Sequence, residues 1–413
     1  FALSMLITIL CVIYSWNHFP EPHNPKAFLA LVLLLEVGMN GTFVAQDLIL
    51  FFIFFEVVLL PMFFMIGVWG GPNREYASIK FFLFTLFGSA LMLLSFLAIF
   101  FKSGAHTFDI VELHGAGNAL AGTTQMLIFG GMFVGFAIKV PMFPFHTWLP
   151  DAHVQAPTAG SVILAGVLLK LGGYGFIRFA IPLFPEGAQA FAPIMVALSV
   201  IAIIYGAIVA IVQTDLKKLI AYSSVSHMGF VTLGIFSFNQ QGVDGAILQM
   251  LNHGLITSGL FLLVGIGYER THDREIAKMG GWASRTPVYA ALFGFFLFAS
   301  VGLPGLSGFV GEFLVLLGAF LANPVVAGAA TLVMVLAAVY LLWMYQRIFM
   351  GPLSPFLKGL GTHLTDITAI EIATLAPLAA MIVAFGILPS LLTNAVAASV
   401  AQFLMFASGG AIR

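Results

Sequence analysis

The chain has 413 residues, of which 61% are hydrophobic and only 8% are charged, and its formal net charge is −1. Soluble globular chains carry about 25% charged residues, so no soluble fold could bury this much apolar surface and lipid must be the solvent. The near-zero net charge gives no electrostatic reason for nucleic-acid binding. The single cysteine, Cys11, excludes a disulfide framework, a thiolate metal cage and a cysteine-ligated iron–sulfur cluster.

Apolar segments run along the whole chain. A membrane-spanning helix needs roughly 20 mainly apolar residues, and we count about twelve such segments. The sequence therefore predicts an all-α polytopic membrane protein. In chain order the predicted spans are 1–16, 27–43, 47–69, 78–101, 123–148, 158–184, 191–212, 217–238, 243–268, 287–321, 324–350 and 367–388. The apolar tail 390–406 is expected either to extend the last span or to lie at the membrane interface.

The loops between these segments differ in charge. One alternating set holds nearly all the loop lysines and arginines, and the opposite set holds only Lys102 and Arg178. Because cytoplasmic loops are enriched in Lys and Arg, the first set is predicted to lie on the cytoplasmic side, and the C-terminus on the far side. The basic residues of the first set are Lys26, Arg74, Lys80, Lys217, Lys218, Arg270, Arg274, Lys278, Arg285, Arg347 and Lys358.

A weak internal repeat is visible. Asp47 opens one span in Gln-Asp-Leu, and Asp215 opens another in Thr-Asp-Leu, 168 positions later. One span is interrupted at Val140-Pro141 and another at Gly302-Leu-Pro-Gly, at an offset of 163 positions. The repeat unit is then about five helices, and because five is odd the second unit enters the membrane from the opposite side. Inverted repeats with broken helices at matching positions are typical of transporters and indicate an ion site at the breaks.

The predicted organisation has four parts. Residues 1–26 form an N-terminal helix, 27–184 and 185–350 form two inverted five-helix repeats, and 351–413 form a C-terminal helix and tail. The chain begins at Phe1, inside an apolar run, with no Met and no cleavable signal pattern. We therefore expect that an N-terminal part precedes it in the full protein.

Four ionisable residues lie within apolar spans. A charge at a helix centre costs about 2.5–3.5 kcal/mol on insertion scales, so each one needs a reason to be there. Glu56 follows Phe-Phe-Ile-Phe-Phe, and Lys139 directly precedes the Val-Pro break, where a freed carbonyl admits water. Lys170 lies among small residues, and Glu312 follows the second break. We predict that all four carry protons. The alternatives are structural ion pairing for the acids and snorkelling to the interface for the lysines.

Two histidines lie on polar stripes of otherwise apolar spans. Ser223 shares a helix face with His227, and Gln249 and Thr257 share a face with His253. A neutral imidazole accepts a proton on one nitrogen and donates one from the other, so the two histidines suit a proton relay. The alternative is hydrogen bonding that only holds helices together.

Weaker candidates accompany these residues. Glu36 is expected to line the same interior. His146, Asp151 and His153 follow the first break, where we predict a hydrated loop that leads into the next span. A metal site there is possible, but the spacing matches no standard ligand pattern, and we predict no metal.

The start of the span at 217–238 carries Asp215, Lys217 and Lys218, which we expect to anchor it at the membrane surface. The sequence contains no phosphate-binding glycine loop, no dinucleotide fingerprint and no nucleophile triad. Its glycine-rich stretches are interpreted as sites of close helix packing.

Several of these stretches resemble one family. The run FAIKVPMFPFHTWLPDAH, which ends at His153, followed by APTAGSVILAGVLLK, which ends at Lys170, resembles the antiporter-like membrane subunits of respiratory complex I, NADH:quinone oxidoreductase. So does DLKKLIAYSSVSHMG, which begins at Asp215. With Phe-Phe-Glu at Glu56 and Gly-Glu-Phe at Glu312, the match is closest to the chain M (chain 4) type. It covers essentially the whole chain.

The resemblance implies a discontinuous-helix, antiporter-like fold and a role for each residue. Glu56 and Lys139 correspond to the Glu–Lys pair of the family, and Lys170 to its central channel lysine. Protons would enter from the cytoplasmic side through water around the helices of Lys139 and Lys170. Family members have fourteen helices, so the resemblance also implies that the first two are absent here.

In the second half, the resemblance implies that His227 and His253, in that order, relay protons from the central lysine to Glu312. That carboxylate corresponds to the exit group, where sister subunits carry Lys.

The implied function is that of a proton-translocating, non-redox subunit of NADH:quinone oxidoreductase, in which a buried Glu/Lys/His axis is coupled to quinone reduction elsewhere. No cofactor is expected in this chain. NADH, FMN, iron–sulfur clusters and quinone are expected in partner subunits, and neighbouring antiporter-like subunits are expected at its ends. The implied location is a bacterial inner membrane rather than a mitochondrial one.

Two other kinds of function remain open on the sequence. A subunit of a multisubunit cation/proton antiporter, or of a proton-pumping membrane hydrogenase, would use the same fold and similar charges. A membrane scaffold would use the charges only to hold helices together. Co-purification with flavin and iron–sulfur subunits would distinguish a complex I subunit from a subunit of a cation/proton antiporter.

Overall fold

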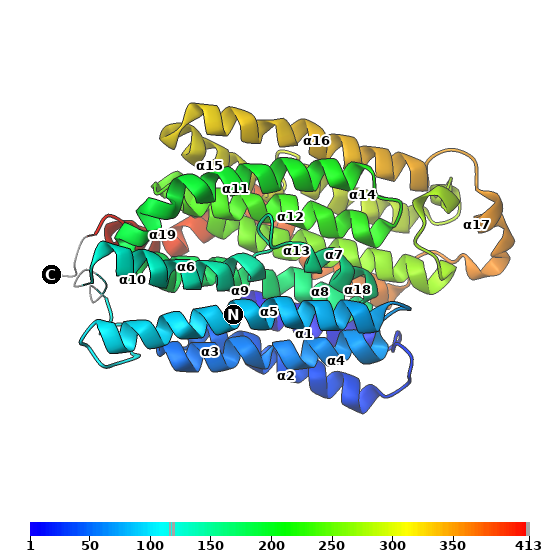
Figure 1. The fold of residues 1–413 in the computed structure, drawn as a ribbon. Helices are drawn as coiled ribbons and strands as arrows, with labels where there is room; N and C mark the ends of the chain where they lie inside the picture. Colours follow the sequence, from blue (N-terminus) through cyan, green and yellow to red (C-terminus); the bar gives the residue numbers. More distant parts are fainter. Residues whose placement is uncertain (115–116, 118–119, 410–413) are drawn as a thin grey trace.

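The computed structural model describes residues 1–114, 117 and 120–409. Most of them lie in helices that run side by side, with connecting loops at the two ends of the bundle (Figure 1). The first half contains α1 (Ala2–Ser15), α2 (Pro25–Val44), α3 (Leu48–Val57), α4 (Leu59–Trp69), α5 (Arg74–Lys102), α6 (Gly122–Lys139), α7 (Trp148–Gln155), α8 (Thr158–Ile163), η2 (Leu164–Leu168), α9 (Leu169–Gly175), η3 (Phe176–Ala180) and α10 (Ile181–Leu183).

The second half contains α11 (Pro185–Ile211), α12 (Leu216–Ile235), α13 (Gln240–Thr271), η4 (Ile276–Lys278), η5 (Trp282–Ser284), α14 (Pro287–Val301), α15 (Ser307–Ala322), α16 (Pro324–Phe349), α17 (Pro355–Gly359), η6 (Gly361–His363), α18 (Ala369–Ile387) and α19 (Ser390–Ala407). In the described part of the chain, nine helices or unbroken helix runs are long and apolar enough to cross a membrane, and α1, α14 and α15 are shorter apolar helices. The prediction of an all-α polytopic membrane protein is confirmed.

The helices at the centre of the bundle are buried on nearly all sides. Almost every residue of α12 is buried, and α13 packs against both α12 and α15. The peripheral α16 instead exposes large apolar side chains such as Val325, Leu332 and Val335. A helix that is buried all round needs no polar face for water. The polar residues of α12 and α13 therefore meet other side chains inside the bundle.

Both predicted helix breaks are confirmed. α6 ends at Lys139 and the chain becomes helical again at Trp148, whereas α14 ends at Val301 and α15 begins at Ser307. At the second break Gly302 has a φ of +86°, a left-handed conformation that glycine adopts without steric cost. Irregular backbone at membrane depth is tolerated where it is enclosed by protein.

The segment after the first break is not the hydrated loop that we predicted. It folds into α7, whose Trp148 is fully buried, and His146 and His153 are also buried. Asp151 forms an ion pair with Lys80 of α5 at 2.6 Å. The apolar residues between the polar ones draw this segment into the core, and the ion pair satisfies its carboxylate.

The apolar tail forms a helix of its own. α18 ends at Ile387 and α19 begins after Pro389, so the tail does not continue α18 as one rod. α19 packs against α13 and α10, and Gln189 of α11 donates to the carbonyl of Ala407 at 2.9 Å.

Two loops at opposite ends of the bundle share one backbone arrangement (Figure 1). Asp47 forms an isolated antiparallel bridge with Asp109, and Asp215 forms one with Glu275. Each of the two aspartates also caps the helix that follows it. The matching backbone hydrogen bonds run from Leu48 N to Phe108 O and from Leu216 N to Arg274 O, both 2.9 Å. The two matching contacts involve the same Asp-Leu pairs that carry the weak sequence repeat, and the five-helix repeat itself stays a prediction.

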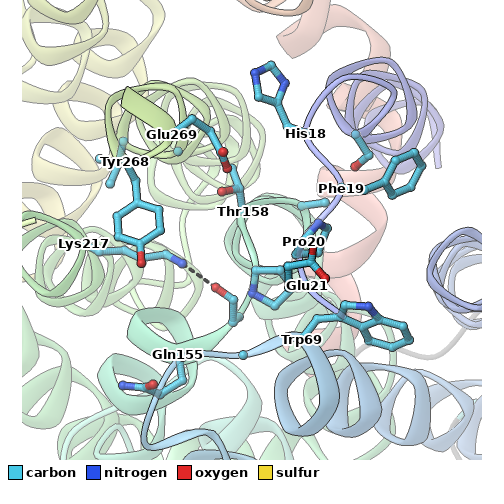
Figure 2. Close-up of a pocket in the computed structure, with 18 of the residues that line it drawn as sticks. His18, Phe19, Pro20, Glu21, Trp69, Gln155, Thr158, Lys217, Tyr268 and Glu269 are labelled. Carbon is cyan, nitrogen blue, oxygen red and sulfur yellow. Dashed lines mark hydrogen bonds between the residues drawn. The ribbon is translucent and has the colours of Figure 1, made fainter. Parts of the chain in front are cut away.

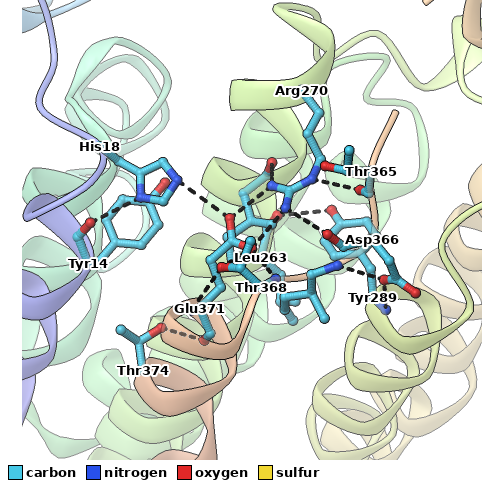
Figure 3. A network of polar contacts seen from close by, with 12 residues as sticks. Tyr14, His18, Leu263, Arg270, Tyr289, Thr365, Asp366, Thr368, Glu371 and Thr374 are labelled. Carbon is cyan, nitrogen blue, oxygen red and sulfur yellow. Dashed lines mark hydrogen bonds and ion pairs between the residues drawn. The ribbon is translucent and has the colours of Figure 1, made fainter. Parts of the chain in front are cut away.

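A polar network attaches α18 to α13 at the predicted cytoplasmic end (Figure 3). Arg270 forms a two-pronged ion pair with Glu371, at 2.9 and 2.8 Å, and donates to the carbonyls of Thr365 and Asp366. Glu371 also completes a capping box with Thr368. One buried carboxylate thus holds both the start of α18 and the end of α13.

His18, in the loop between α1 and α2, joins the same network. Its Nε2 lies 3.4 Å from Glu371, its Nδ1 lies 3.1 Å from the carbonyl oxygen of Tyr14, and its ring stacks on the Tyr14 ring at 4.7 Å. Both ring nitrogens face acceptors, so the ring can donate to both only as the cation. The hydrogen bond with Glu371 raises the pKa of His18.

We expect Arg270→Gln to destabilise the chain by about 3–5 kcal/mol, because it removes the two-pronged, permanently charged partner of the buried Glu371 carboxylate and leaves only His18 as a counter-ion. Thermal denaturation of the purified complex and the amount of chain in the membrane measure the effect. Arg285→Gln, at an exposed arginine, is the control and should cost within about 0.5 kcal/mol. Equal losses for the two variants would contradict this role of Arg270.

The stabilisation from His18 should depend on pH. Because its pKa is raised, the contribution is fully present below the ordinary pKa of 6.5 and is lost as the pH rises through the raised value. We expect His18→Gln to lower the denaturation temperature at about pH 5.5 and to have little effect at about pH 9, with a maximum near 1 kcal/mol. A decrease of the same size at both pH values would rule out the charged pair.

Candidate functional site

Four of the six predicted site residues form one buried row of side chains. Lys170 Nζ lies 2.7 Å from His253 Nδ1, and His227 Nδ1 lies 2.8 Å from Glu312 Oε1. The two imidazole rings are 5.9 Å apart between centroids. All four side chains are buried, with at most 5% of the residue exposed. We call the row Lys170–His253–His227–Glu312 the buried axis.

The order along the buried axis differs from the predicted one, in which His227 came before His253. Helix α13 packs against both η2, next to Lys170, and α12. His253 on α13 is therefore the histidine that meets Lys170, and His227 on α12 is the one that meets Glu312.

Lys170 lies on a short α-helical stretch between two π-helical segments, η2 and η3. π-Helical turns inside α-helices often occur at functional sites. The Lys170 ammonium also donates to the carbonyl of Ala165, five residues earlier. Small residues let α6 approach closely, as predicted: a Cβ atom at Gly172 would lie 2.6 Å from the carbonyl oxygen of Phe136. The irregular helix thus holds the lysine in a tightly packed interior.

The two histidines and Glu312 surround a cavity of about 10 Å³. This volume is near the minimum that holds one water molecule. Gln249 donates to Glu312 at 3.2 Å, and the hydroxyl of Ser300 lies 3.3 Å from His227 Nε2. Nε2 of His253 has no hydrogen-bond partner among the described residues. One water in this cavity would link the two imidazoles.

The second helix break faces the carboxylate at the end of the buried axis. A Cβ atom at Gly302 would lie 3.3 Å from Glu312 Oε2, so the bare backbone of the break leaves space beside it. Tyr340 of α16 lies within electrostatic range of Glu312, and its buried hydroxyl has no hydrogen-bond partner in the described part of the chain. Sequence analysis missed Tyr340, since a lone tyrosine in an apolar span carries no distinctive pattern.

Glu56 and Lys139 lie on neighbouring elements without forming an ion pair in the described residues. Lys139 Nζ is buried without a hydrogen-bond partner and lies 4.6 Å from the centre of the Phe55 ring. A desolvated cation is attracted by the face of an aromatic ring. Glu56 is the penultimate residue of α3, beside the interruption at Val58 that separates α3 from α4. The structure therefore brings the two side chains near each other without a direct ion pair between them, which we call the open arrangement.

The weaker candidates lie at three separate places. Glu36 accepts hydrogen bonds from Asn40, at 2.6 Å, and from Thr8, so it lies between α1 and α2 and has no hydrogen bond to the buried axis among the described residues. His146 packs against the Tyr205 ring at 5.1 Å. His153 stacks on Phe261 at 4.6 Å.

Lys217 is not the surface anchor that we predicted. Its side chain is buried, with 6% of the residue exposed, and its ammonium donates to the carbonyl of Ala156 at 2.5 Å (Figure 2). It lines a cavity of about 360 Å³ near the predicted cytoplasmic end. Asp215 instead pairs with Arg274 at 3.3 Å. The sequence pattern Asp-Leu-Lys-Lys identified the helix start but not which lysine turns inward.

No metal centre forms in the part of the chain that the structure describes, since no three His, Cys, Asp or Glu side chains gather there in a metal-binding arrangement. The chemistry available at the site is proton transfer between nitrogen and oxygen atoms at hydrogen-bond distance.

Comparisons with known proteins show which family this chain belongs to. Residues 45–339 match the family model described as NADH:quinone oxidoreductase/Mrp antiporter, TM. The chain is 52% identical over 411 residues to NADH-quinone oxidoreductase subunit M of Rhodobacter capsulatus, which covers 97% of this chain and 79% of the relative.

Two solved structures share the fold. A chain of respiratory complex I from Thermus thermophilus with bound NADH superposes with a TM-score of 0.90 at 35% identity and covers 98% of this chain and 83% of that one. A chain of the Mrp complex from Dietzia sp. DQ12-45-1b has a TM-score of 0.86 at 23% identity, with 97% and 82% covered. The resemblance seen in the motifs is therefore confirmed, and the chain belongs to the NADH:quinone oxidoreductase/Mrp antiporter transmembrane family.

Proposed function

We propose that this chain is a chain M-type, proton-translocating subunit of NADH:quinone oxidoreductase in a bacterial cytoplasmic membrane, and that protons cross it along the buried axis. The name and source of the similar Rhodobacter protein support the enzyme and its location. The observation that carries the proton path is the row of 2.7 Å and 2.8 Å contacts that joins Lys170 to Glu312 through two imidazoles.

Each transfer along the buried axis uses one hydrogen-bonded contact. Protonated Lys170 donates to Nδ1 of His253, and His253 then releases a proton from Nε2. A water in the small cavity takes up this proton and gives one to Nε2 of His227. His227 releases a proton from Nδ1 to the Glu312 carboxylate. The exposed backbone of the second break then offers water a route to Glu312.

The charges of Glu56 and Lys139 control this transfer in the proposed mechanism. When the two side chains pair, the lysine is held in its charged form. When they separate, as in the open arrangement with Lys139 over Phe55, the buried cation loses its counter-ion and favours proton release. A change between these two arrangements alters the charge on Lys139 and thereby the tendency of Lys170 to take up or release a proton.

The electron chemistry belongs to partner subunits in this proposal. Every group on the buried axis exchanges protons and none exchanges electrons. NADH, FMN, iron–sulfur clusters and quinone would be held elsewhere in the complex, and neighbouring antiporter-like subunits would meet the two ends of the chain. The repeats 27–184 and 185–350 would each contribute one broken helix to the path.

A subunit of a cation/proton antiporter is the second candidate, because the Mrp chain shares the fold. Purification from native membranes separates the two functions. We expect flavin and iron–sulfur subunits to co-purify with this chain, whereas their absence together with antiporter subunits would favour the second candidate.

Lys170→Met and Glu312→Gln should lower the protons pumped per NADH oxidised by at least the share of one proton path, because each interrupts the buried axis. The measurement is the quench of a pH-sensitive dye in vesicles that contain the intact complex, normalised to assembled complex. His363→Gln, on an exposed histidine outside the axis, is the control. Unchanged pumping per assembled complex, with only a loss of stability, would instead support the scaffold function.

Glu56→Gln and Lys139→Gln should lower pumping to a similar extent, and the double variant should be no worse than the stronger single one. Residues that act as a unit show this non-additivity. Phe51→Leu, in the same aromatic cluster but without a cation on its ring, is the control for packing damage. Independent, additive losses would show that the two charges do not act as a pair.

A further inference from the structure

A cavity lined by the buried Lys217 opens at the predicted cytoplasmic end. It has a volume of about 360 Å³ and lies between α1, α8, α12 and α13 (Figure 2). Glu21 and Glu269 contribute carboxylates to its wall, and Tyr14 contributes a buried hydroxyl without a hydrogen-bond partner in the described part of the chain. These polar groups suit a cavity filled with water rather than one that binds an apolar ligand.

Lys217 contributes a buried cationic side chain to the wall of this cavity. Among the described residues its ammonium has a single hydrogen-bond partner, the carbonyl oxygen of Ala156 at 2.5 Å, and the nearby Asp215 is already paired with Arg274. A buried ammonium that lacks a counter-ion releases its proton more readily than an exposed one. A lysine used only to hold two helices together would be expected to have a carboxylate partner.

His153 lies on α7, three residues before Ala156. Its ring is fully buried, stacks on Phe261 at 4.6 Å, and neither nitrogen has a hydrogen-bond partner among the described residues. It is within electrostatic range of both Lys217 and Lys170. An imidazole with two unsatisfied nitrogens therefore lies within electrostatic range of both the lysine of the cavity wall and the lysine of the buried axis.

We propose that Lys217 is the proton-loading site of this chain, which takes protons from water in the 360 Å³ cavity and passes them through His153 to Lys170. A hydronium ion gives its proton to the neutral amine of Lys217, and the ammonium gives one to a nitrogen of His153. The imidazolium then protonates Lys170, and Lys217 and His153 return to their neutral forms. This inference rests on the proposed function, and it places the entrance between α1, α8, α12 and α13 instead of around α6.

Substitutions at Lys217 separate proton loading from helix anchoring. Arginine keeps the charge and the hydrogen bond to Ala156 but does not deprotonate in proteins. We expect both Lys217→Arg and Lys217→Met to lower pumping per assembled complex to the level of Lys170→Met. Lys218→Met, on the neighbouring and less buried lysine, should leave it unchanged. Normal pumping with Lys217→Arg would overturn the inference and leave Lys217 as an anchor.

The Lys170→Met variant distinguishes failure of the proposed function from failure of the proposed loading site at Lys217. If Lys170→Met leaves pumping unchanged, the proposed function itself fails. If Lys170→Met lowers pumping while Lys217→Arg does not, only the loading site fails. Both measurements use the intact complex in sealed vesicles.

A labelling experiment tests the cavity independently. Thr158 lines it, and Cys11 is the only native cysteine of the chain, so Thr158→Cys is made in a Cys11→Ser background. A membrane-impermeant thiol reagent applied from the cytoplasmic side should react with the new cysteine and lower pumping relative to the same unlabelled variant. Ser103→Cys, in a loop at the other end of the bundle, should react only from the opposite side. Reaction of Thr158→Cys without loss of pumping, or no reaction at all, would overturn the inference.

Discussion

The free-energy cost of burying ionisable side chains in a membrane governs how this protein is built. An isolated charge in the membrane interior is costly, so each such group must find a partner or stay neutral. The buried axis meets this demand by joining every member to another polar group, from Lys170 through His253 and His227 to Glu312. In the proposed function, the contacts that make burial tolerable are also the contacts along which a proton would move.

The irregular parts of the helices lie where these groups are. Lys139 is the last residue before the first helix break, and Glu312 lies on α15 after the second break. Lys170 lies between two π-helical segments, and Glu56 lies beside the interruption at Val58. A regular α-helix uses all its backbone donors and acceptors internally, and so leaves none for side chains or water. Breaking the helix supplies free backbone groups and space inside a shell of regular helices that faces the lipid.

Different membrane complexes share this fold, so the function proposed for the chain depends on its buried charged residues. The similarity to both a complex I chain and an Mrp chain shows that one helical arrangement serves different membrane complexes. A path for protons requires titratable side chains along the centre of the bundle. It also requires water-accessible cavities that lead to those side chains. The network around Glu371 lies apart from this path and holds α18, α13 and the loop of His18 together.

The all-helical membrane class, the two helix breaks and the residues of the buried axis could all be predicted from the amino-acid sequence. Those features depend on local composition: long apolar runs, Val-Pro and Gly-Leu-Pro-Gly interruptions, and costly charges within spans. Tertiary structure alone decided the order of His253 and His227, the open arrangement of Glu56 and Lys139, and the folding of residues 148–155 into a buried helix. It also turned Lys217 inward while Lys218 stayed nearer the surface. These outcomes depend on which helices pack together and how each is rotated, and no pattern within a single span records that.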